Sequence, residues 1–532
     1  MIRARKMLAL VCVLMLAMPA ATQMHEPLDL EAVQKMKDEG LNRSQVMDII
    51  SWLTDVHGPR LTGSPQIRAA GEWAIGKLKE WGLANPRFES WGPFGRGWSN
   101  ERFYAQVIAP VPFPVLGYSM AWTPGTNGLV TADVVPVTVT TAEDFAKYKG
   151  QLRGKIVLLG PPRVVNPAWD PIARRYSDEQ LEGLSQQTFP PVRQPGKAGQ
   201  QFGGGGGQQM VARRNQFFAE EGVVATLEPG AGRGDGGSVV VGRGGSQAVD
   251  APPTVTRISI ASEHFGRLYR ILDKKIPVKM ELNVENKFYD QDLNGFNVLA
   301  EIPGTDKADE LVMLGAHFDS WHSGTGATDN AAGSAVMLEA VRILKASGLK
   351  MRRTVRIGLW GGEEQGLIGS REHVAANFGA AVQGKWDLKP AHAKFSGYFN
   401  IDNGTGKIRG VYLQGNEAIA PVFKRWMEPF ANMGMTTLSI RNTGGTDHLS
   451  FDRAGLPGFQ FIQDQMEYST RTHHSNMDQY DRIQPNDMRQ MAIILAAFVY
   501  HAANRDQLLP RKPMPPAPAP RGPRGGGPPG EP

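Results

Sequence analysis

Cysteine is nearly absent from this sequence, because Cys12 is the only one among 532 residues. Cys12 lies in an N-terminal stretch typical of a secretory signal, so the exported chain would contain no thiol. That absence excludes disulfides, thiolate metal sites and a cysteine nucleophile. Any metal ion must therefore be held by histidine and carboxylate side chains.

The body of the chain also lacks a net charge. The 58 basic residues outnumber the 52 acidic residues, but the excess lies at the two ends of the sequence. The first 22 residues carry three basic side chains, and the last 22 carry four against one acid, which leaves 51 of each sign between them. A body of this kind gives no indication of a basic face, so we expect no nucleic-acid partner.

Apolar runs long enough to span a membrane are missing as well. The run Met7–Met18 follows basic residues at 3–6 and precedes the small residues Ala20 and Ala21, the order found in a secretory signal peptide. It is too short to cross a bilayer comfortably. We expect residues 1–22 to be removed and the protein to be exported to the periplasm or the extracellular space, with no stable membrane span left. An uncleaved membrane anchor is the alternative.

The composition and periodicity of the sequence change several times along the chain. Helical patterns fill Leu30–Lys37, Ser44–Asp55 and Ser64–Trp81. Residues rich in Val and Thr from about 129 onward indicate strands. Beyond Asn286, apolar strands alternate with helices, which is the pattern of a parallel α/β sheet. We therefore expect an α/β protein with a mixed, mostly parallel sheet between layers of helices.

Two further stretches are dominated by glycine and proline. Residues 162–209 are irregular and end in five consecutive glycines, so they are predicted to form a mobile insertion. Residues 510–532 consist largely of Pro and Gly and are predicted to be a disordered tail.

Acidic and histidine side chains collect where the predicted strands end. Leu311–Ala316 is a buried strand pattern, followed at once by His317 and Asp319. A glycine-containing loop then leads to Asp329 at the start of a helix. An aspartate at this position is usually just a helix cap, but the nearby His-x-Asp pair favours a ligand site, because ligands bind at the carboxyl ends of strands in open α/β sheets.

The same arrangement recurs downstream in the sequence. A strand at 354–360 runs into the adjacent acids Glu363 and Glu364, and a strand at 398–401 ends at Asp402. The pair His473-His474 follows a turn-rich segment. A glutamate pair can merely favour a helix start, and a lone histidine is seldom a ligand. Carboxylates and histidines at the ends of successive strands are costly to bury without a cation, so together they indicate a metal site.

These motifs resemble those of the co-catalytic di-zinc exopeptidases of the aminopeptidase Y and plasma glutamate carboxypeptidase type, and most of all the carboxypeptidase Q branch. The resemblance runs from Arg60-Leu-Thr-Gly-Ser64 to Arg511. It implies a zinc peptidase fold made from residues 23–125 and 285–509. It also implies an inserted, β-rich protease-associated domain at 126–284, with the 162–209 stretch as an extra insertion inside it.

The resemblance further implies a role for each site residue. His317 and Asp402 would hold one zinc ion, Glu364 and His474 a second, and Asp329 would bridge the two. Glu363 matches the general base and Asp319 the residue that supports His317. His473 stands where many members carry a tyrosine, so the group that stabilises the oxyanion is left open.

The implied function is hydrolysis of peptide bonds at chain ends by an exported enzyme with two zinc ions per chain. The zinc ions would activate a water molecule and polarise the scissile carbonyl, with Glu363 accepting the proton. Aminopeptidase and carboxypeptidase or dipeptidase activity both stay open, and short peptides are the expected substrates. A homodimer is suggested by the resemblance alone. The alternatives are a catalytically weak receptor on the same fold and a single-zinc glutaminyl cyclase.

Overall fold

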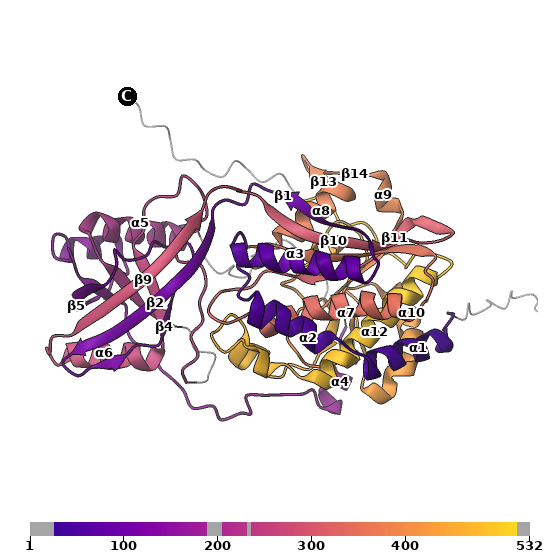
Figure 1. Ribbon diagram of the computed structural model, residues 1–532, viewed down its shortest axis with the longest axis horizontal. Coiled ribbons are helices and arrows are strands. Elements are labelled where there is room, and N and C mark those ends of the chain that lie inside the picture. Colours follow the sequence, from indigo (N-terminus) through magenta and orange to yellow (C-terminus); the bar gives the residue numbers. More distant parts are fainter. Residues whose placement is uncertain (1–25, 189–204, 231–235, 519–532) are drawn as a thin grey trace, which may run out of the picture.

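The computed structural model describes residues 26–188, 205–230 and 236–518 (Figure 1). The predicted signal peptide, the first two of the five glycines at 203–207 and the end of the predicted tail from 519 lie outside the described residues. Within these ranges, no helix is both long enough and apolar enough to span a membrane. Two eight-stranded sheets make up the framework.

The main sheet lies between two layers of helices. In spatial order its strands are β1 (Ala84–Trp91), β10 (Gly295–Ile302), β12 (Arg353–Trp360), β11 (Lys307–His317), β15 (Phe395–Asn400), β18 (Gly458–Gln463), β16 (Ile408–Tyr412) and β17 (Thr437–Ser439). Four neighbouring pairs are parallel and three are antiparallel, with the parallel pairs concentrated at β12, β11, β15 and β18. The predicted mixed, mostly parallel sheet is confirmed.

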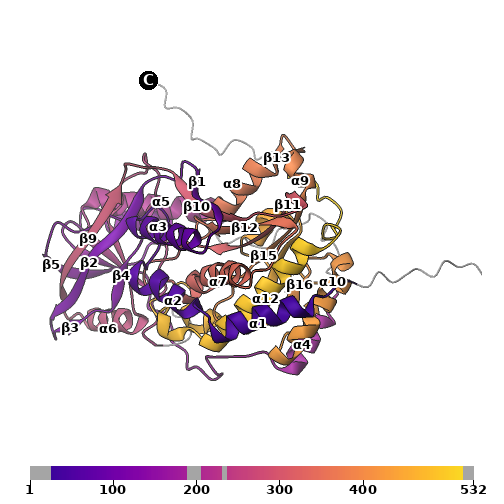
Figure 2. The ribbon, with the colours of Figure 1, turned by 45° about the vertical axis from the view of Figure 1, so that its right-hand side comes forward.

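The larger hydrophobic core lies on one face of this sheet. The helices over it are α1 (Leu30–Asn42), α2 (Val46–Ser51), α3 (Pro65–Glu80), α7 (Ala332–Ala346), α10 (Ala420–Met427) and α12 (Pro485–Asn504) (Figure 2). Ser64 caps α3 by accepting the N–H of Ile67, and Pro65 stands in the first turn. The helices α7 and α12 are buried nearly all round because they lie between the sheet and the outer helices.

A smaller core covers the opposite face of the main sheet. It is built from α8 (Ile368–Asn377), α11 (His448–Asp452) and aromatic side chains such as Trp360, Phe378 and Phe451. The short helix α9 (Pro390–Ala393) and the hairpin of β13 (Gly379–Val382) and β14 (Lys385–Leu388) lie beside it. The ends of β11, β12 and β15 are thereby held rigidly from both sides.

The second sheet forms the part at the left of Figure 1. In spatial order its strands are β3 (Phe113–Pro114), β2 (Gly97–Ala109), β9 (Lys279–Tyr289), β5 (Val130–Val137), β6 (Ile156–Leu159), β7 (Ala225–Pro229), β8 (Thr256–Ile260) and β4 (Gly117–Ser119). The helix α6 (Ser262–Asp273) packs on one apolar cluster of this sheet, and α5 (Gly205–Glu221) contributes Phe218 to another.

The second sheet extends beyond the segment 126–284 that the sequence sets apart. Strands β2, β3 and β4 come before residue 126, and β3 and β4 lie in a stretch rich in proline and glycine. They belong to the sheet because β2 pairs with β9 as a long antiparallel ribbon, from Gly97 opposite Tyr289 to Ala109 opposite Lys279. The assignment of 126–284 to a protease-associated domain stays a prediction.

Parts of the two Gly- and Pro-rich stretches are ordered. Within the insertion, α4 (Asp178–Ser185) has a capping box at Ser177 and packs against the main sheet at β17. The ordered chain also continues past the predicted boundary at 509, to residue 518. Arg511 donates hydrogen bonds to the carbonyls of His392 and Phe395, which fastens this segment to the main part.

Candidate metal centre

Three adjacent parallel strands deliver the first site residues to one edge of the main sheet. His317 is the last residue of β11, Glu363 and Glu364 follow the end of β12, and Asp402 follows the end of β15. Parallel neighbours present their carboxyl ends on the same side, so these residues converge although long stretches of sequence separate them.

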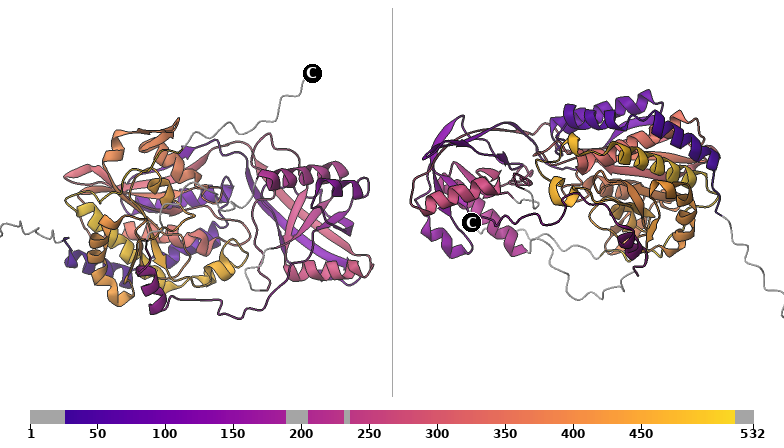
Figure 3. Two further views of the ribbon diagram at one scale, coloured as in Figure 1. Left: turned by 180° about the vertical axis from the view of Figure 1, so that it is seen from behind. Right: turned by 90° about the horizontal axis from the view of Figure 1, so that it is seen from below.

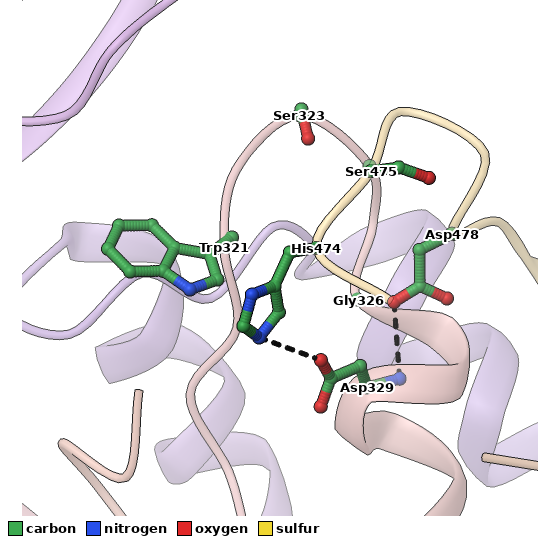
Figure 4. A pocket seen from close by; sticks show the side chains of 8 residues that line it. Trp321, Ser323, Gly326, Asp329, His474, Ser475 and Asp478 are labelled. Carbon is green, nitrogen blue, oxygen red and sulfur yellow. Dashed lines mark hydrogen bonds and ion pairs between the residues drawn. The ribbon is translucent and has the colours of Figure 1, made fainter. Parts of the chain in front are cut away.

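Asp329 lies at the centre of the cluster. It is carried by the segment Ala327–Ala331, which leads into α7. Its Oδ1 lies 3.1 Å from Nε2 of His317, and its Oδ2 lies 3.2 Å from Nε2 of His474 (Figure 4). One carboxylate thus faces two imidazoles on opposite sides, which is the arrangement that a bridging ligand requires.

The first group around Asp329 is buried and compact. Nε2 of His317 lies 3.2 Å from Oδ1 of Asp402. The possible ligand atoms of His317, Asp329 and Asp402 all lie within 4.8 Å of one another, and all three residues are buried. Nδ1 of His317 donates to the backbone carbonyl of Asp319 at 2.9 Å, which leaves Nε2 as the nitrogen that faces the carboxylates.

The second group contains Glu364 and both histidines of the 473–474 pair. Nε2 of His474 lies 2.9 Å from Oε2 of Glu364. The possible ligand atoms of Asp329, His473 and His474 also lie within 4.8 Å of one another, and the two imidazole rings stack with centroids 3.8 Å apart. His473, for which the sequence suggests no definite role, therefore belongs to a group of side chains that could hold a metal ion.

The charges of the cluster fit bound cations. Burial opposes a charge on His474, but the Glu364 and Asp329 carboxylates outweigh it and raise the His474 pKa to about 10. Burial raises the pKa of Glu364 to about 7 despite the opposing effect of His474. Oε1 of Glu364 is buried and has no hydrogen-bond partner among the described residues. Carboxylates that require this much positive charge, together with imidazoles and no sulfur, form a donor set suited to zinc.

Asp319 supports the site differently from the sequence-based expectation. Its carboxylate oxygen lies 3.8 Å from Nδ1 of His317, which its backbone carbonyl contacts instead. The carboxylate accepts the backbone N–H groups of Glu363 at 3.1 Å and Glu364 at 3.3 Å, and the hydroxyl of Thr62 at 2.8 Å. Asp319 therefore links the end of β11 to the turn that carries both glutamates.

Glu363 occupies the first position of that turn. Burial raises the pKa of its carboxyl well above the usual value, and nearby Asp402 adds to the effect while His317 opposes it. A carboxylate that favours its protonated form beside a group of metal ligands is suited to accept and return a proton.

Two buried residues at the site were missed by sequence reasoning. Arg60 donates to the carbonyls of Leu53, Phe318, Thr325 and Gly326, and so holds the loop between His317 and Asp329. Asp478 accepts the backbone N–H of Thr328 at 2.6 Å. The motif that begins at Arg60 gives no indication of this role, because the partners of Arg60 are backbone atoms, and Asp478 stands four residues after His474 without a motif of its own.

A small cavity adjoins Asp329 and His474. It is lined by Trp321, Ser323, Gly324, Gly326, Asp329, His474, Ser475 and Asp478 (Figure 4). Its volume of about 10 Å³ is close to the minimum for one water molecule. The indole ring of Trp321 meets the His474 imidazole nearly edge-on, with centroids 6.2 Å apart.

Known proteins share both the sequence pattern and the fold. Residues 297–499, which contain every proposed ligand, match the sequence profile described as Peptidase family M28. These residues form an M28 peptidase region. The chain is 25% identical over 488 residues to carboxypeptidase Q of Mus musculus, covering 90% of each chain.

Two solved structures share the fold of this chain. The first is a peptidase M28 precursor from Shewanella amazonensis, with a TM-score of 0.63 and 24% identity, covering 91% of this chain and 98% of that one. The second is a zinc aminopeptidase from Bacillus subtilis, with a TM-score of 0.53 and 17% identity, covering 87% and 95%. The resemblance inferred from the motifs is confirmed, and residues 297–499 form a peptidase region of the M28 type.

Proposed function

We propose that this M28 protein is an exported exopeptidase that binds two zinc ions per chain. The first ion would be held by His317 and Asp402, the second by Glu364 and His474, and Asp329 would be shared. The single observation that carries the proposal is the position of the Asp329 carboxylate, with one oxygen 3.1 Å from the His317 imidazole and the other 3.2 Å from that of His474.

The residues around the ligands supply the rest of the mechanism. Zinc would polarise the scissile carbonyl and lower the pKa of the attacking water. Glu363 would accept the proton of that water at its carboxylate and return it to the leaving amine. Asp319 would hold Glu363 and Glu364 in place through their backbone N–H groups. With zinc at Nε2, the buried His317 would be neutral, and its Nδ1–H would keep the hydrogen bond to the Asp319 carbonyl.

Short peptides are the proposed substrates. The site lies at the carboxyl ends of the main-sheet strands, where the second sheet approaches. His322, beside the site, donates to the Ser119 carbonyl in β4, and the Trp321 ring lies near the Trp122 ring, with centroids 6.2 Å apart. These contacts narrow access for a folded protein chain. Cleavage at either end of a short peptide is consistent with this arrangement.

Zinc analysis combined with a peptide panel tests the proposal. Purified protein should contain two zinc ions per chain, and it should hydrolyse short peptides only when at least one terminus is free. Panels with a blocked amino end, a blocked carboxyl end or both blocks distinguish aminopeptidase from carboxypeptidase or dipeptidase activity. A single zinc ion, or cyclisation of amino-terminal glutamine without peptide hydrolysis, would overturn the proposal.

Export rests on the sequence of the first 22 residues. We expect the mature chain to begin near 21–24 and to be found outside the cytoplasm. Amino-terminal sequencing of protein from the native cell checks this, and a chain that begins at Met1 in the cytoplasm would contradict it.

A further inference from the structure

The ligand His474 lies on a long connection rather than at a strand end. The connection, residues 464–478, starts directly after β18 and continues to Asp478. His474 adopts a backbone φ of +61°, in the left-handed region that side chains other than glycine rarely occupy. A connection with such a residue keeps its conformation only when its surroundings fix it.

Residues 237–241, which lie between strands β7 and β8 of the second sheet, fix the end of the connection where His474 lies. The backbone N–H of Val241 donates to the carbonyl of His474 at 3.1 Å. The backbone N–H of Asn476 donates to the carbonyl of Val239 at 3.2 Å, and the Asn476 side-chain oxygen accepts the N–H of Val239 at 2.7 Å. The Asn476 amide also donates to the Gly237 carbonyl at 3.3 Å. Residues 237–241 thus bind the connection at His474 itself and at Asn476, two positions further on.

The insertion fixes the other end of the connection. Arg174 and Met466 exchange two backbone hydrogen bonds, at 3.0 and 2.7 Å. The hydroxyl of Thr470 donates to the carbonyl of Ile172 at 2.7 Å. Figures 1 and 3 show the purple chain leaving the second sheet and running along the main part to α4, so these contacts bridge the two parts of the molecule.

Charge reinforces the attachment at this end. Asp464, which has no exposed surface, accepts the Arg175 guanidinium at 2.8 Å and the backbone N–H of Tyr176 at 3.0 Å. Arg175 also reaches Asp487 in α12, at 2.7 Å. Asp464 also accepts Arg409 of β16 at 3.0 Å, so this buried carboxylate is shared between the insertion and the main sheet, and losing Arg175 leaves it with one cation fewer.

We propose that residues 170–176 and 237–241 position the zinc ligand His474 by holding connection 464–478 at both ends. The inference rests on the proposed zinc site. It assigns residues 170–176 and 237–241, which lie outside the matched region 297–499, a direct role at that site. Zinc binding and attachment of these segments are then thermodynamically linked, because both require the same conformation of one connection. Removing zinc loosens the attachment, and weakening the attachment lowers the affinity for zinc.

Asn476→Ala tests the end nearest to the ligand. The variant removes the side-chain bonds to Val239 and Gly237 without touching a ligand. We expect it to weaken one of the two zinc sites by about 10–100-fold, the usual effect of losing a residue that supports a ligand. The turnover number should fall, with KM much less affected. Backbone amides of Val239 and Val241 should exchange hydrogen faster, as they should in wild-type protein stripped of zinc.

Two further variants keep the test falsifiable. Asn476→Asp retains the acceptor for the Val239 N–H and should recover part of the zinc affinity. Arg175→Met weakens the distant end and should act in the same direction as Asn476→Ala. Asn504→Ala is the matched control, since it removes a side-chain acceptor for a backbone N–H, that of Arg352 at 3.1 Å, far from the site. It should leave zinc binding unchanged.

The outcomes separate this inference from the proposed function. If Asn476→Ala and Arg175→Met keep both zinc ions with wild-type affinity while His474→Ala loses one, positioning by the attached segments is overturned and the metal assignment stands. If amide exchange at Val239 and Val241 does not respond to zinc, the linkage is overturned as well. A wild-type protein with one zinc ion that His474→Ala retains would overturn the assignment of His474 itself.

Discussion

The carboxylate of Asp478 accepts the backbone N–H of Asp329 at 3.1 Å (Figure 4). It also accepts the N–H of Thr328, so a buried acid fixes the backbone at the residue that faces both histidines. Burial and the neighbouring Asp329 raise the pKa of Asp478 to about 7, and the two N–H donors oppose that change. The position of the shared ligand therefore depends on a residue that contacts no metal itself.

Asp478→Asn should weaken the metal site and the fold together. The amide keeps one acceptor oxygen but points its NH₂ group at a backbone N–H, leaving a buried donor unsatisfied at a cost of about 1–3 kcal/mol. Zinc affinity should fall by about 10–100-fold. Asp144→Asn is the control away from the site, since Asp144 accepts the backbone N–H groups of Thr140 and Thr141 at one oxygen, which the amide retains. Equilibrium dialysis with zinc and urea unfolding should show lost zinc affinity and lost stability in Asp478→Asn, and unchanged zinc affinity in Asp144→Asn.

Acid should destabilise the contact between the two parts of the molecule. His322 is buried, its Nε2 donates to the Ser119 carbonyl at 2.7 Å, and burial lowers its pKa to about 4. The unfolded chain, with a histidine pKa of about 6.5, takes up the proton first, so the free energy of unfolding falls as pH drops from about 6.5 to 4. The loss from this one residue is at most about 3 kcal/mol.

His322→Gln removes this titration while keeping a donor for Ser119. Urea unfolding of both proteins without metal, at several pH values from 4 to 7, gives the two dependences. The free energy of unfolding should fall less steeply with acid in the variant than in the wild type. Equal slopes would show that His322 does not contribute.

Three of the five proposed ligands were predictable from the sequence because they follow strongly apolar strands. His317 and Asp402 come directly after such a pattern and Glu364 comes four residues after one, and strand order brings these strand ends together. Arg60 and Asp478 could not be found this way, because they act on backbone atoms, and no residue type or spacing reports a backbone partner. The pairing of residues 237–241 with the His474 connection was equally hidden, since the partners are more than two hundred positions apart.

The extent of the second sheet shows the same limit. Phe113–Pro114 and Gly117–Ser119 are too short and too rich in Pro and Gly to read as strands, yet both pair within the sheet. Their pairing is decided by β2 and β8, which supply complete edges for them. Tertiary context therefore overrides local propensity there.

Removing the shared ligand should have a larger effect than removing either histidine. His317→Ala and His474→Ala should each lose one zinc ion, whereas Asp329→Ala should impair binding of both, since its two oxygens face the two groups. Metal analysis after dialysis against a weak chelator measures the count directly. His264→Ala, in the second sheet's part, should keep two. Equal loss of one ion in all three site variants would contradict the shared role of Asp329.

Glu363→Gln should separate the chemistry from metal binding. Glutamine preserves the size of the side chain but cannot accept a proton, and general acid–base catalysis contributes about 10²–10⁴-fold in rate. We expect turnover to fall by at least that range, while zinc content and stability stay near wild type because no ligand is lost. Glu364→Gln is the informative comparison, because the loss of a carboxylate next to His474 should reduce zinc content as well as rate.

The two glutamates can then be distinguished by metal analysis and steady-state kinetics on the same preparations. If Glu363 merely stabilised the turn after β12, its replacement would cost about 0.3–1 kcal/mol of stability and leave turnover nearly intact. Near-normal turnover with both zinc ions in place would therefore remove Glu363 as the base. Loss of zinc from Glu363→Gln but not from Glu364→Gln would mean that the ligand and the base are reversed. Such a reversal is compatible with this fold because the backbone N–H groups of both residues donate to the carboxylate of Asp319, which holds the two glutamates in adjacent positions.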